Sequence, residues 1–167
     1  LAAAGVEAER LPDQPHGLTL KSRSGDLRQL PGYEEGHWCV QDRSAQLIAP
    51  LLEARPGERV LDACAAPGGK ATHLAELMGD HGEIWAVDRG AGRLQRLERN
   101  ARRLGLRSIR SRVVEAQHLA QEEPGWIGSF DRLLLDAPCS GLGTLARHAD
   151  ARWRITPEAI EELIAVS

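Results

Sequence analysis

The sequence predicts an α/β fold with a doubly wound, mostly parallel sheet. From Glu58 onward, short apolar runs that end on polar residues alternate with segments of helical periodicity. Strands that alternate with helices in this way form a parallel sheet with helices on both faces. A glycine-rich turn at residues 67–69 joins the first of these strands to its helix. Ligands of such sheets bind at the carboxyl ends of the strands, so functional residues are expected there.

The individual elements follow from periodicity and from helix boundary signals. Strands are expected at residues 59–63, 83–88, 109–114 and 130–136. Helices are expected at residues 44–54 and, after the glycine turn, over a segment that includes Leu74, Leu77 and Met78. A third helix is expected at 91–104, where one stripe carries Leu94, Leu97, Ala101 and Leu104. A last helix is expected to start at Thr156, which Pro157 follows. Upstream, the chain is rich in turn formers, and short strands are expected at residues 16–20 and 26–30.

Length and charge set broad limits on function. The 167-residue chain is long enough for one domain with its own core, and its formal net charge is -3. Net charge alone therefore indicates no polyanionic partner. Nearly all of the positive charge is arginine, since only Lys21 and Lys70 are lysines. Arginine binds phosphate in a planar fork, so this skew weakly indicates nucleic acid binding, but a GC-rich genome explains it equally well.

Three cysteines, Cys39, Cys64 and Cys139, lie far apart without a C-x-x-C spacing. This is not the spacing of a disulfide framework or a zinc site, so we expect reduced thiols in a cytoplasmic protein without a metal. No run is long and apolar enough to span a membrane, and the first residues lack the basic stretch of a signal peptide. The chain starts without methionine and ends within a helical pattern, which indicates a fragment cut at both ends.

The loop at residues 64–70 is the strongest local signal for a ligand. Its glycines let backbone N–H groups approach a ligand, and the N-terminus of the following helix favours negative charge. A phosphate-binding P-loop needs glycine five places before its Gly-Lys pair and Ser or Thr after it, where this sequence has Cys64 and Ala71. The dinucleotide fingerprint G-x-G-x-x-G is missing from this loop as well. S-adenosylmethionine remains as the candidate ligand.

Acidic residues end three of the four expected strands and would meet at one edge of the sheet. Asp88 closes the second strand, 19 positions after Gly69, where a carboxylate can accept hydrogen bonds from the ribose hydroxyls of an adenosine. Glu115 ends the third strand and Asp136 the fourth. An acid at a strand end also serves as a helix N-cap, so Asp88 alone favours neither role. Together with the glycine loop, these residues predict a ligand-binding cleft.

Residues 89–112 hold nine arginines and a single acid, Glu98. A solvated outer helix face is the default interpretation of such a run. Contact with the phosphates of a nucleic acid is the alternative, and the sequence alone does not favour it.

Three stretches resemble a known family: LDACAAPGGKATHLAEL, AVDRGAGRLQRLERNARRLGL and FDRLLLDAPCSGLGTLARHADARW. They are similar to the cofactor-binding half of the Sun/Fmu-type RNA (cytosine-5)-methyltransferases, which include a bacterial enzyme of small-subunit ribosomal RNA. The resemblance implies a Rossmann-like class I S-adenosylmethionine-dependent methyltransferase, truncated on its C-terminal side, with ribosomal RNA as its partner. It also divides the chain into residues 1–36, the end of a linker or N-terminal RNA-binding subdomain, and residues 37–167, the N-terminal part of the methyltransferase domain.

The resemblance also implies a role for each matching position. The positions that bind the cofactor in the family fall on Cys64, Ala65, Ala66, Pro67, Gly68, Gly69, Lys70, Asp88, Glu115 and Asp136. The third-strand acid of the family is usually aspartate, so Glu115 departs from the pattern.

The chemistry of the family gives Cys139 its expected role. Carbon 5 of cytosine is a weak nucleophile, so a cysteine thiolate first adds to carbon 6 of a base that has left its stack, while Asp136 holds the base edge. In the family this cysteine lies in a Thr-Cys motif on the next strand, and the Pro-Cys thiol assists product release. Cys139 matches the Pro-Cys position, so we expect an accessory catalytic role for it and a nucleophile beyond residue 167. Two alternatives stay open: a DNA cytosine-5 methyltransferase with Cys139 as nucleophile, and a non-catalytic RNA-binding or assembly module.

Overall fold

The main body of the protein is a four-stranded parallel sheet with the strand order β5-β4-β3-β6. The computed structural model describes residues 1, 5–12, 14–21, 25–137 and 156. The strands are β3 (Arg59–Asp62), β4 (Glu83–Asp88), β5 (Ile109–Val113) and β6 (Arg132–Leu134). From β3 the chain passes to β4 and β5 on one side and returns to β6 on the other, so the order reverses at β3. The predicted α/β fold with a parallel sheet is confirmed.

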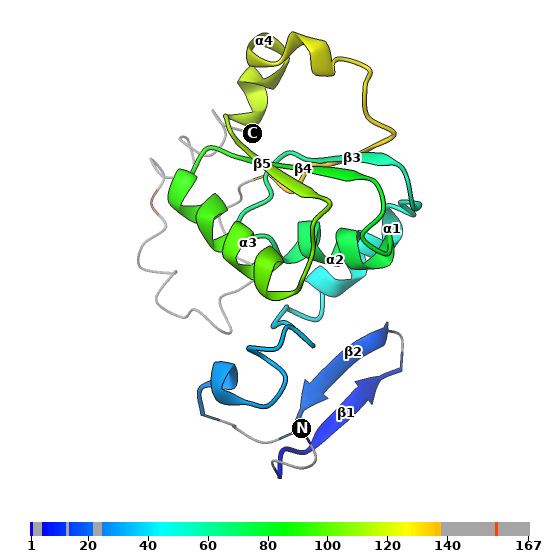
Figure 1. Cartoon of the computed structure of the whole chain (residues 1–167), viewed down its shortest axis with the longest axis vertical. Helices are drawn as coiled ribbons and strands as arrows, with labels where there is room; N and C mark the ends of the chain where they lie inside the picture. Colours follow the sequence, from blue (N-terminus) through cyan, green and yellow to red (C-terminus); the bar gives the residue numbers. More distant parts are fainter. Residues whose placement is uncertain (2–4, 13, 22–24, 138–155, 157–167) are drawn as a thin grey trace.

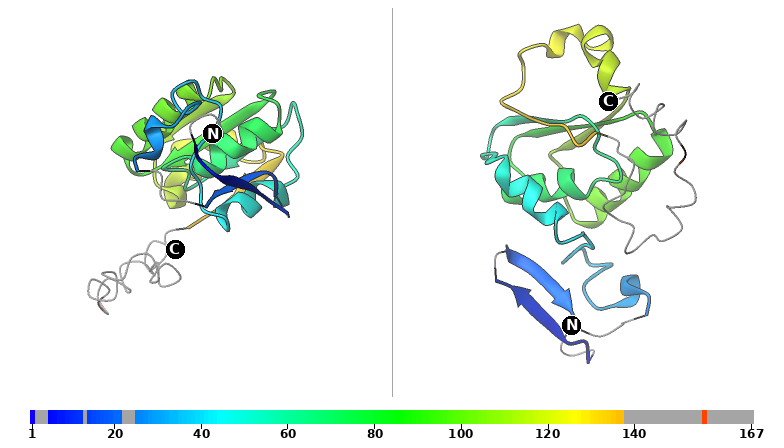
Figure 2. Two further views of the ribbon diagram at one scale, coloured as in Figure 1. Left: turned by 90° about the horizontal axis from the view of Figure 1, so that it is seen from below. Right: turned by 180° about the vertical axis from the view of Figure 1, so that it is seen from behind.

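Helices cover both faces of this sheet, as the sequence predicts (Figures 1 and 2). On one face lie α1 (Ile48–Leu51), α2 (Gly69–Leu77) and α3 (Ala91–Arg103). On the other face lie η4 (Ala116–His118), α4 (Leu119–Glu122) and η5 (Pro124–Trp126). None of the described helices is long and apolar enough to cross a membrane.

Alternation along the strands builds one hydrophobic core on each face of the sheet. Val60 and Ile84 belong to the core under α2 and α3, with the buried Leu74 and Leu97. The residue after Val60, Leu61, belongs to the core on the opposite face, which Trp126 and its neighbours partly cover. A central parallel strand buried on both faces needs a nearly continuous apolar run, which explains the composition of β3 and β4.

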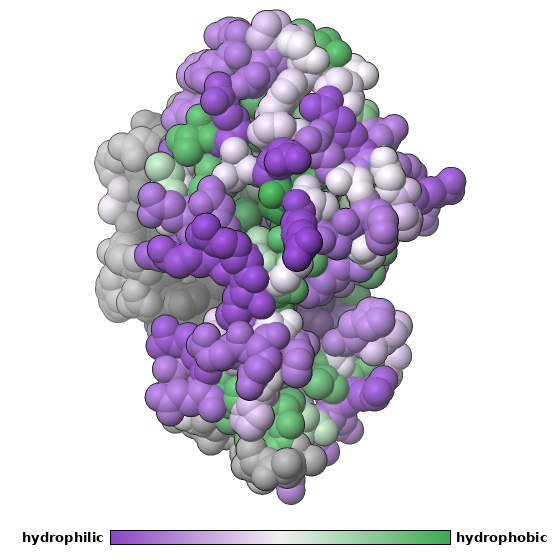
Figure 3. All heavy atoms as spheres, in the orientation of Figure 1, coloured by the Kyte–Doolittle hydropathy of each residue, from purple (hydrophilic) through white to green (hydrophobic). Residues whose placement is uncertain are grey.

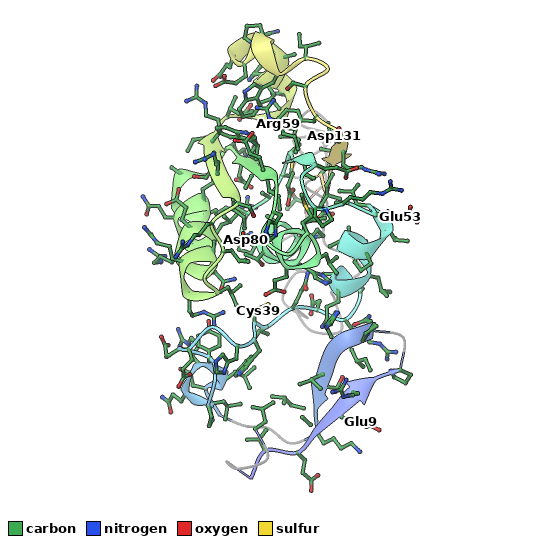
Figure 4. All side chains as sticks on the ribbon, turned by 45° about the vertical axis from the view of Figure 1, so that its right-hand side comes forward. Glu9, Cys39, Glu53, Arg59, Asp80 and Asp131 are labelled. Carbon is green, nitrogen blue, oxygen red and sulfur yellow. The ribbon has the colours of Figure 1, made fainter. Side chains whose placement is uncertain are left out.

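The N-terminal part of the chain forms a separate two-stranded antiparallel sheet, β1 (Ala8–Leu11) and β2 (Gln14–Leu20). This hairpin lies beyond the helices, on the side away from the large sheet (Figure 1). Its Gln14 Nε2 donates a hydrogen bond to the carbonyl of Arg43 at 3.0 Å. Cys39 lies in the segment that leads from the hairpin to the main body (Figure 4). The strand expected at residues 16–20 forms the last five residues of β2.

Three predicted elements differ from the structure. The strand expected at residues 26–30 is wrong: Asp26 Oδ1 accepts a hydrogen bond from the Arg28 N–H, and the segment forms the 3-10 turn η2 (Leu27–Gln29). The helix expected at 44–54 is shorter, with η3 (Ala45–Leu47) followed by one turn of α1, because Pro50 has no N–H to donate to the preceding turn. The fourth strand ends at Leu134 and not at residue 136. The helix expected from Thr156 lies outside the described residues, except for Thr156 itself.

The turn into α2 is built around Gly68. Its φ of 107° lies in the region that only glycine adopts freely, and a Cβ atom there would lie 2.5 Å from Leu97 Cγ of α3. Thr72 Oγ1 donates a hydrogen bond to the Gly68 carbonyl at 2.9 Å. A residue without a side chain thus lets α2 begin directly against α3, and this contact sets the position of the loop after β3.

Beneath that loop, β3 ends on a buried carboxyl group. Asp62 is 1% exposed, and neither of its carboxylate oxygens has a hydrogen-bond partner among the described residues. Burial raises the pKa of Asp62 from 3.8 to about 7, although the charge of Lys70 opposes the shift. Between these pH values the folded state binds a proton that the unfolded state lacks, so ionisation of Asp62 destabilises the fold as the pH rises.

We expect Asp62→Asn to remove a pH-dependent destabilisation. In the wild-type protein, Asp62 should lower the free energy of unfolding by roughly 1.4 kcal/mol for each pH unit between its unfolded and its folded pKa. The variant should therefore gain stability relative to the wild type as the pH rises through this window, with a constant difference above it. Urea unfolding of both proteins at several pH values measures the difference. Two parallel stability curves would show that Asp62 does not titrate in the fold.

We expect Gly68→Ala to destabilise the protein more than Gly57→Ala. Both glycines have a positive φ, 107° at Gly68 and 91° at Gly57, so both variants carry backbone strain. Only at Gly68 does the added Cβ meet another residue, since nothing lies within 4 Å of a Cβ at Gly57. The overpacking should cost about 1–3 kcal/mol beyond the loss in the control variant. Denaturant unfolding gives both values, and equal losses would mean that Leu97 moves aside freely.

Candidate functional site

The carboxyl ends of the strands enclose a cavity of about 220 Å³. Its wall is formed by the loop after β3, the end of β4 and the segments that follow β5 and β6. Of the residues singled out in the sequence, five line it: Cys64, Ala66, Asp88, Glu115 and Asp136. The structure therefore brings together acids that are far apart in the sequence, at the edge of the sheet where the topology places a ligand.

Asp88 connects the loop after β3 to the start of α3. Its carboxylate is almost buried, at 4% exposure. Oδ1 accepts a hydrogen bond from the Gly90 N–H at 2.8 Å, and Oδ2 accepts one from the Ala66 N–H at 3.3 Å. The guanidinium of Arg93 lies 3.2 Å from Oδ2 and also donates to the Ala66 carbonyl at 2.7 Å. A carboxylate offers about four acceptor positions, so these three contacts leave capacity for a ligand hydroxyl.

Lys70 and Asp136 form an ion pair that the sequence did not predict. Lys70 Nζ, from the first turn of α2, lies 2.5 Å from Asp136 Oδ2, two residues beyond the end of β6. The lysine side chain is 22% exposed and the aspartate side chain 55%, so the pair faces solvent on the aspartate side. Two groups of opposite charge are thereby held at the edge of the cavity, where a polar ligand can contact either one.

The remaining loop residues have different surroundings. Ala65 is buried, and its N–H donates to the Val87 carbonyl at 2.8 Å, which holds the loop against β4. Gly68 packs on Leu97, whereas Pro67 is exposed and Gly69 is partly exposed at the start of α2. Burial raises the pKa of the Cys64 thiol, and the nearby carboxylates of Asp88 and Asp62 raise it further. Cys64 therefore forms part of the wall as a neutral thiol and has no thiolate character.

Glu115 lies at the opposite wall of the cavity. β5 ends at Val113, so Glu115 follows the strand by two residues and precedes η4. Its Oε2 accepts a hydrogen bond from Gln117 Nε2 at 3.0 Å. Glutamate is longer than the aspartate expected from the family pattern, and the position still reaches the cavity.

Three site features escaped sequence reasoning. Arg89 and Arg93 line the cavity, but the sequence placed them only within an arginine-rich helix. The buried Asp62 lies under the loop, where the sequence showed only a polar residue at a strand end. Arg93 follows Asp88 by five residues and lies in the first turn of α3, and this spacing is the signal that could have identified it. Cys139 lies outside the described residues.

The lining determines which ligands suit the cavity. Alanine side chains from three segments, Ala66, Ala116 and Ala137, provide apolar surface for a flat ring. Asp88 and Glu115 provide acceptors for hydroxyl or amino groups. In the part of the chain that the structure describes, no three His, Cys, Asp or Glu residues are grouped so that they could hold a metal ion. The arrangement suits a ligand that combines an aromatic ring, hydroxyls and positive charge.

Known proteins with related sequences and structures give the family. Residues 49–166 match the family model of the 16S rRNA methyltransferase RsmB/F. The probable ribosomal RNA small subunit methyltransferase B of Synechocystis sp. is 48% identical over 164 residues, which are 98% of this chain and 36% of that protein. The chain thus spans about a third of the length of the curated relatives it matches.

Two solved structures support the same relationship. The structure of PH0851 superimposes with a TM-score of 0.87 at 36% identity, over 98% of this chain and 36% of that one. NSun6 from Pyrococcus horikoshii with SFG superimposes with a TM-score of 0.70 at 32% identity, over 83% of this chain and 34% of that one. The resemblance found in the sequence is confirmed: the chain belongs to the RsmB/F family of 16S rRNA methyltransferases.

Proposed function

We propose that this chain carries the cofactor-binding part of a cytoplasmic enzyme that methylates carbon 5 of a cytosine in small-subunit ribosomal RNA, with S-adenosylmethionine as methyl donor. The observation that supports this most is the cavity lined by the loop after β3, Asp88 and Asp136, whose carboxylate pairs with Lys70. In this proposal, residues 1–36 end an N-terminal RNA-binding subdomain and residues 37–167 belong to the methyltransferase domain.

The residues present fit the cofactor. S-adenosylmethionine combines an adenosine with a charged amino acid, and when bound it supplies an electrophilic methyl group. Asp88 has acceptor capacity left for a ribose hydroxyl, and Glu115 adds a second carboxylate to the wall. The first turn of α2 leaves backbone N–H groups without intrahelical partners, and these can receive the carboxylate of the amino acid. Residues 64–70 and Asp136 then complete the binding site.

The Lys70–Asp136 pair suits the handling of the target base. An unstacked cytosine presents an amidine edge, whose amino group can donate to Asp136 and whose ring nitrogen and carbonyl can accept from Lys70. Both groups already lie together at the edge of the cavity, so binding the base requires little rearrangement of side chains. We propose that this pair orients the base with carbon 5 toward the bound cofactor.

The proposed chemistry proceeds through a covalent adduct of a cysteine. A thiolate sulfur bonds to carbon 6, and the displaced electron pair makes carbon 5 nucleophilic enough to accept the methyl group. A base then removes the proton on carbon 5, the carbon–sulfur bond breaks, and the ring and the thiolate are restored. Cys139 acts in this last stage as the accessory thiol, following the family's Pro-Cys position.

We expect Asp88→Asn to weaken S-adenosylmethionine binding at least tenfold. The variant loses a charged acceptor for the ribose hydroxyls, a loss on the order of 1.5–3 kcal/mol. Asp131→Asn is the matched control, because Asp131 also accepts a backbone hydrogen bond, from the Arg59 N–H at 2.7 Å, but at the opposite edge of the sheet (Figure 4). Calorimetric titration should show near-normal affinity in the control. Equal affinity in both variants would place the ribose contact elsewhere.

We expect Cys139→Ala, introduced into the full-length enzyme that carries the expected nucleophile beyond residue 167, to trap a covalent complex between enzyme and RNA. If Cys139 assists release, attack on carbon 6 still occurs in the variant and the adduct accumulates. Incubation with labelled S-adenosylmethionine and ribosomal RNA, followed by denaturing electrophoresis, measures both methyl transfer and adduct. Cys39→Ala is the control, since Cys39 lies in the segment before the main body (Figure 4). Loss of methyl transfer without any adduct would identify Cys139 as the nucleophile, and a preference for DNA over RNA would support the DNA-type alternative.

A further inference from the structure

α3 has one buried side and one strongly basic side. Leu94, Leu97 and Ala101 are buried against the sheet. The exposed side carries arginines at nearly every turn, and Figure 3 shows hydrophilic residues gathered over this helix. The only acid of the helix, Glu98, accepts a hydrogen bond from Ser111 Oγ of β5 at 2.5 Å. Its charge therefore lies toward the sheet and does not neutralise the exposed side.

The structure sorts eight of the nine arginines of residues 89–112 into two groups. The ninth, Arg107, follows α3, and its backbone N–H donates to the Asp80 carboxylate. The first group has partners in the protein. Arg93 contacts Asp88, Arg110 lies 3.1 Å from Glu83, and Arg112 lies 2.6 Å from Glu123. Arg103 donates to the carbonyls of Tyr33 and Trp38, and its guanidinium stacks on the Tyr33 ring at 3.9 Å. These four side chains have structural roles, including the attachment of the N-terminal segment.

The second group consists of Arg89, Arg96, Arg99 and Arg102, which we call the arginine face. All four are exposed, and none forms an ion pair or side-chain hydrogen bond with any residue that the structure describes. Four cations held close together without counter-charges repel one another, in a chain whose net charge is -3. Such an arrangement lowers stability slightly and is favourable only when an anionic partner is bound.

We propose that the arginine face binds the phosphate backbone of the RNA next to the target nucleotide. This inference rests on the proposed function, because it assumes that the target base enters the cavity. Arg89 lines that cavity and also belongs to the arginine face, so the basic surface begins at the cavity and continues along α3. The 13 residues of α3 extend over roughly 20 Å, which is enough to follow several phosphates of one strand.

The chemistry of the face favours phosphate over other anionic partners. The guanidinium presents paired donors that match two oxygens of one phosphate, and among the described residues nothing accepts from the guanidinium donors of these four arginines. The exposed side of α3 carries no large apolar side chain that could enter a lipid layer. On the exposed side of α3 single charges recur regularly, without apolar positions between them. Such a row suits the regularly repeating phosphates of a nucleic-acid strand.

Salt-dependent RNA affinity tests the proposal. Binding of a small-subunit ribosomal RNA fragment to wild type, Arg96→Gln/Arg99→Gln and Arg110→Gln/Arg112→Gln is measured by fluorescence anisotropy at several salt concentrations. The control removes the same number of charges from neighbouring positions, but its arginines are already paired with acids. We expect the first variant to shallow the log–log salt slope by about 1.4, or 0.7 for each lost single-strand contact, and the control to keep the wild-type slope.

Cofactor titration of the same variants separates this proposal from the proposed function. Neither substitution pair touches the cavity lining, so S-adenosylmethionine affinity should stay at the wild-type value. An unchanged salt slope in Arg96→Gln/Arg99→Gln, or an equal loss in both variants, overturns the arginine face while leaving the methyltransferase function intact. A wild-type protein that binds neither the cofactor nor RNA would instead contradict the proposed function itself.

Discussion

The carboxylate of Asp88 is the interaction on which the candidate site depends. It ends the central β4 strand and accepts hydrogen bonds from the loop after β3 and from the start of α3, while Arg93 bridges back to that loop. Because the loop has no regular structure of its own, these contacts fix where its backbone lies relative to the neighbouring strands. Asp88 thus holds the loop in place and also faces the cavity, so a change that disturbs the loop also changes the surface available to a ligand.

The distribution of charge separates the inside of the site from its outside. Three carboxylates, Asp88, Glu115 and Asp136, line the cavity together with Arg89 and Arg93, whereas the exposed side of α3 is basic. The carboxylates of the cavity suit the hydroxyls and positive charge of a cofactor such as S-adenosylmethionine, and a basic outer surface suits a polyanion such as RNA. The net charge of -3 sums the whole chain and does not reveal this local basic surface. In the proposed function, this basic surface lets a chain with a net charge of -3 bind RNA.

Much of the fold and part of the site could be predicted from the sequence. The apolar runs of β3 and β4 are buried on both faces, so their pattern is strong, and Gly68 marks a turn that other residues enter only with strain. The elements that were wrong depend on single side chains: Asp26 turns residues 26–30 into a 3-10 turn, and Pro50 interrupts the helix expected at 44–54. The structure of these two segments depends on local hydrogen bonding, which the periodicity of apolar residues does not reveal.

Most residues of the site could be predicted from the sequence, but the contacts between their side chains could not. Asp88, Glu115 and Asp136 were expected at strand ends, and the topology of a parallel sheet brings such ends together. The Lys70–Asp136 pair depends on the distance between the first turn of α2 and the segment after β6, 66 positions apart in the chain. Sequence patterns carry no information on such a distance. The same holds for Arg93 and Arg103 of α3, which contact Asp88 of β4 and the carbonyls of the N-terminal segment, respectively.

The most direct test of the central claim is a titration of the protein with S-adenosylhomocysteine followed by the chemical shifts of backbone amides. If the cavity is the cofactor site, the shifts should concentrate in residues 63–70, 88–90, 115–117 and 136–137, around the cavity lining. The second cavity, between α3 and β5 and lined by Leu97 and Ile109, should show no change. Shifts confined to that second cavity, or no shifts at all, would contradict the account.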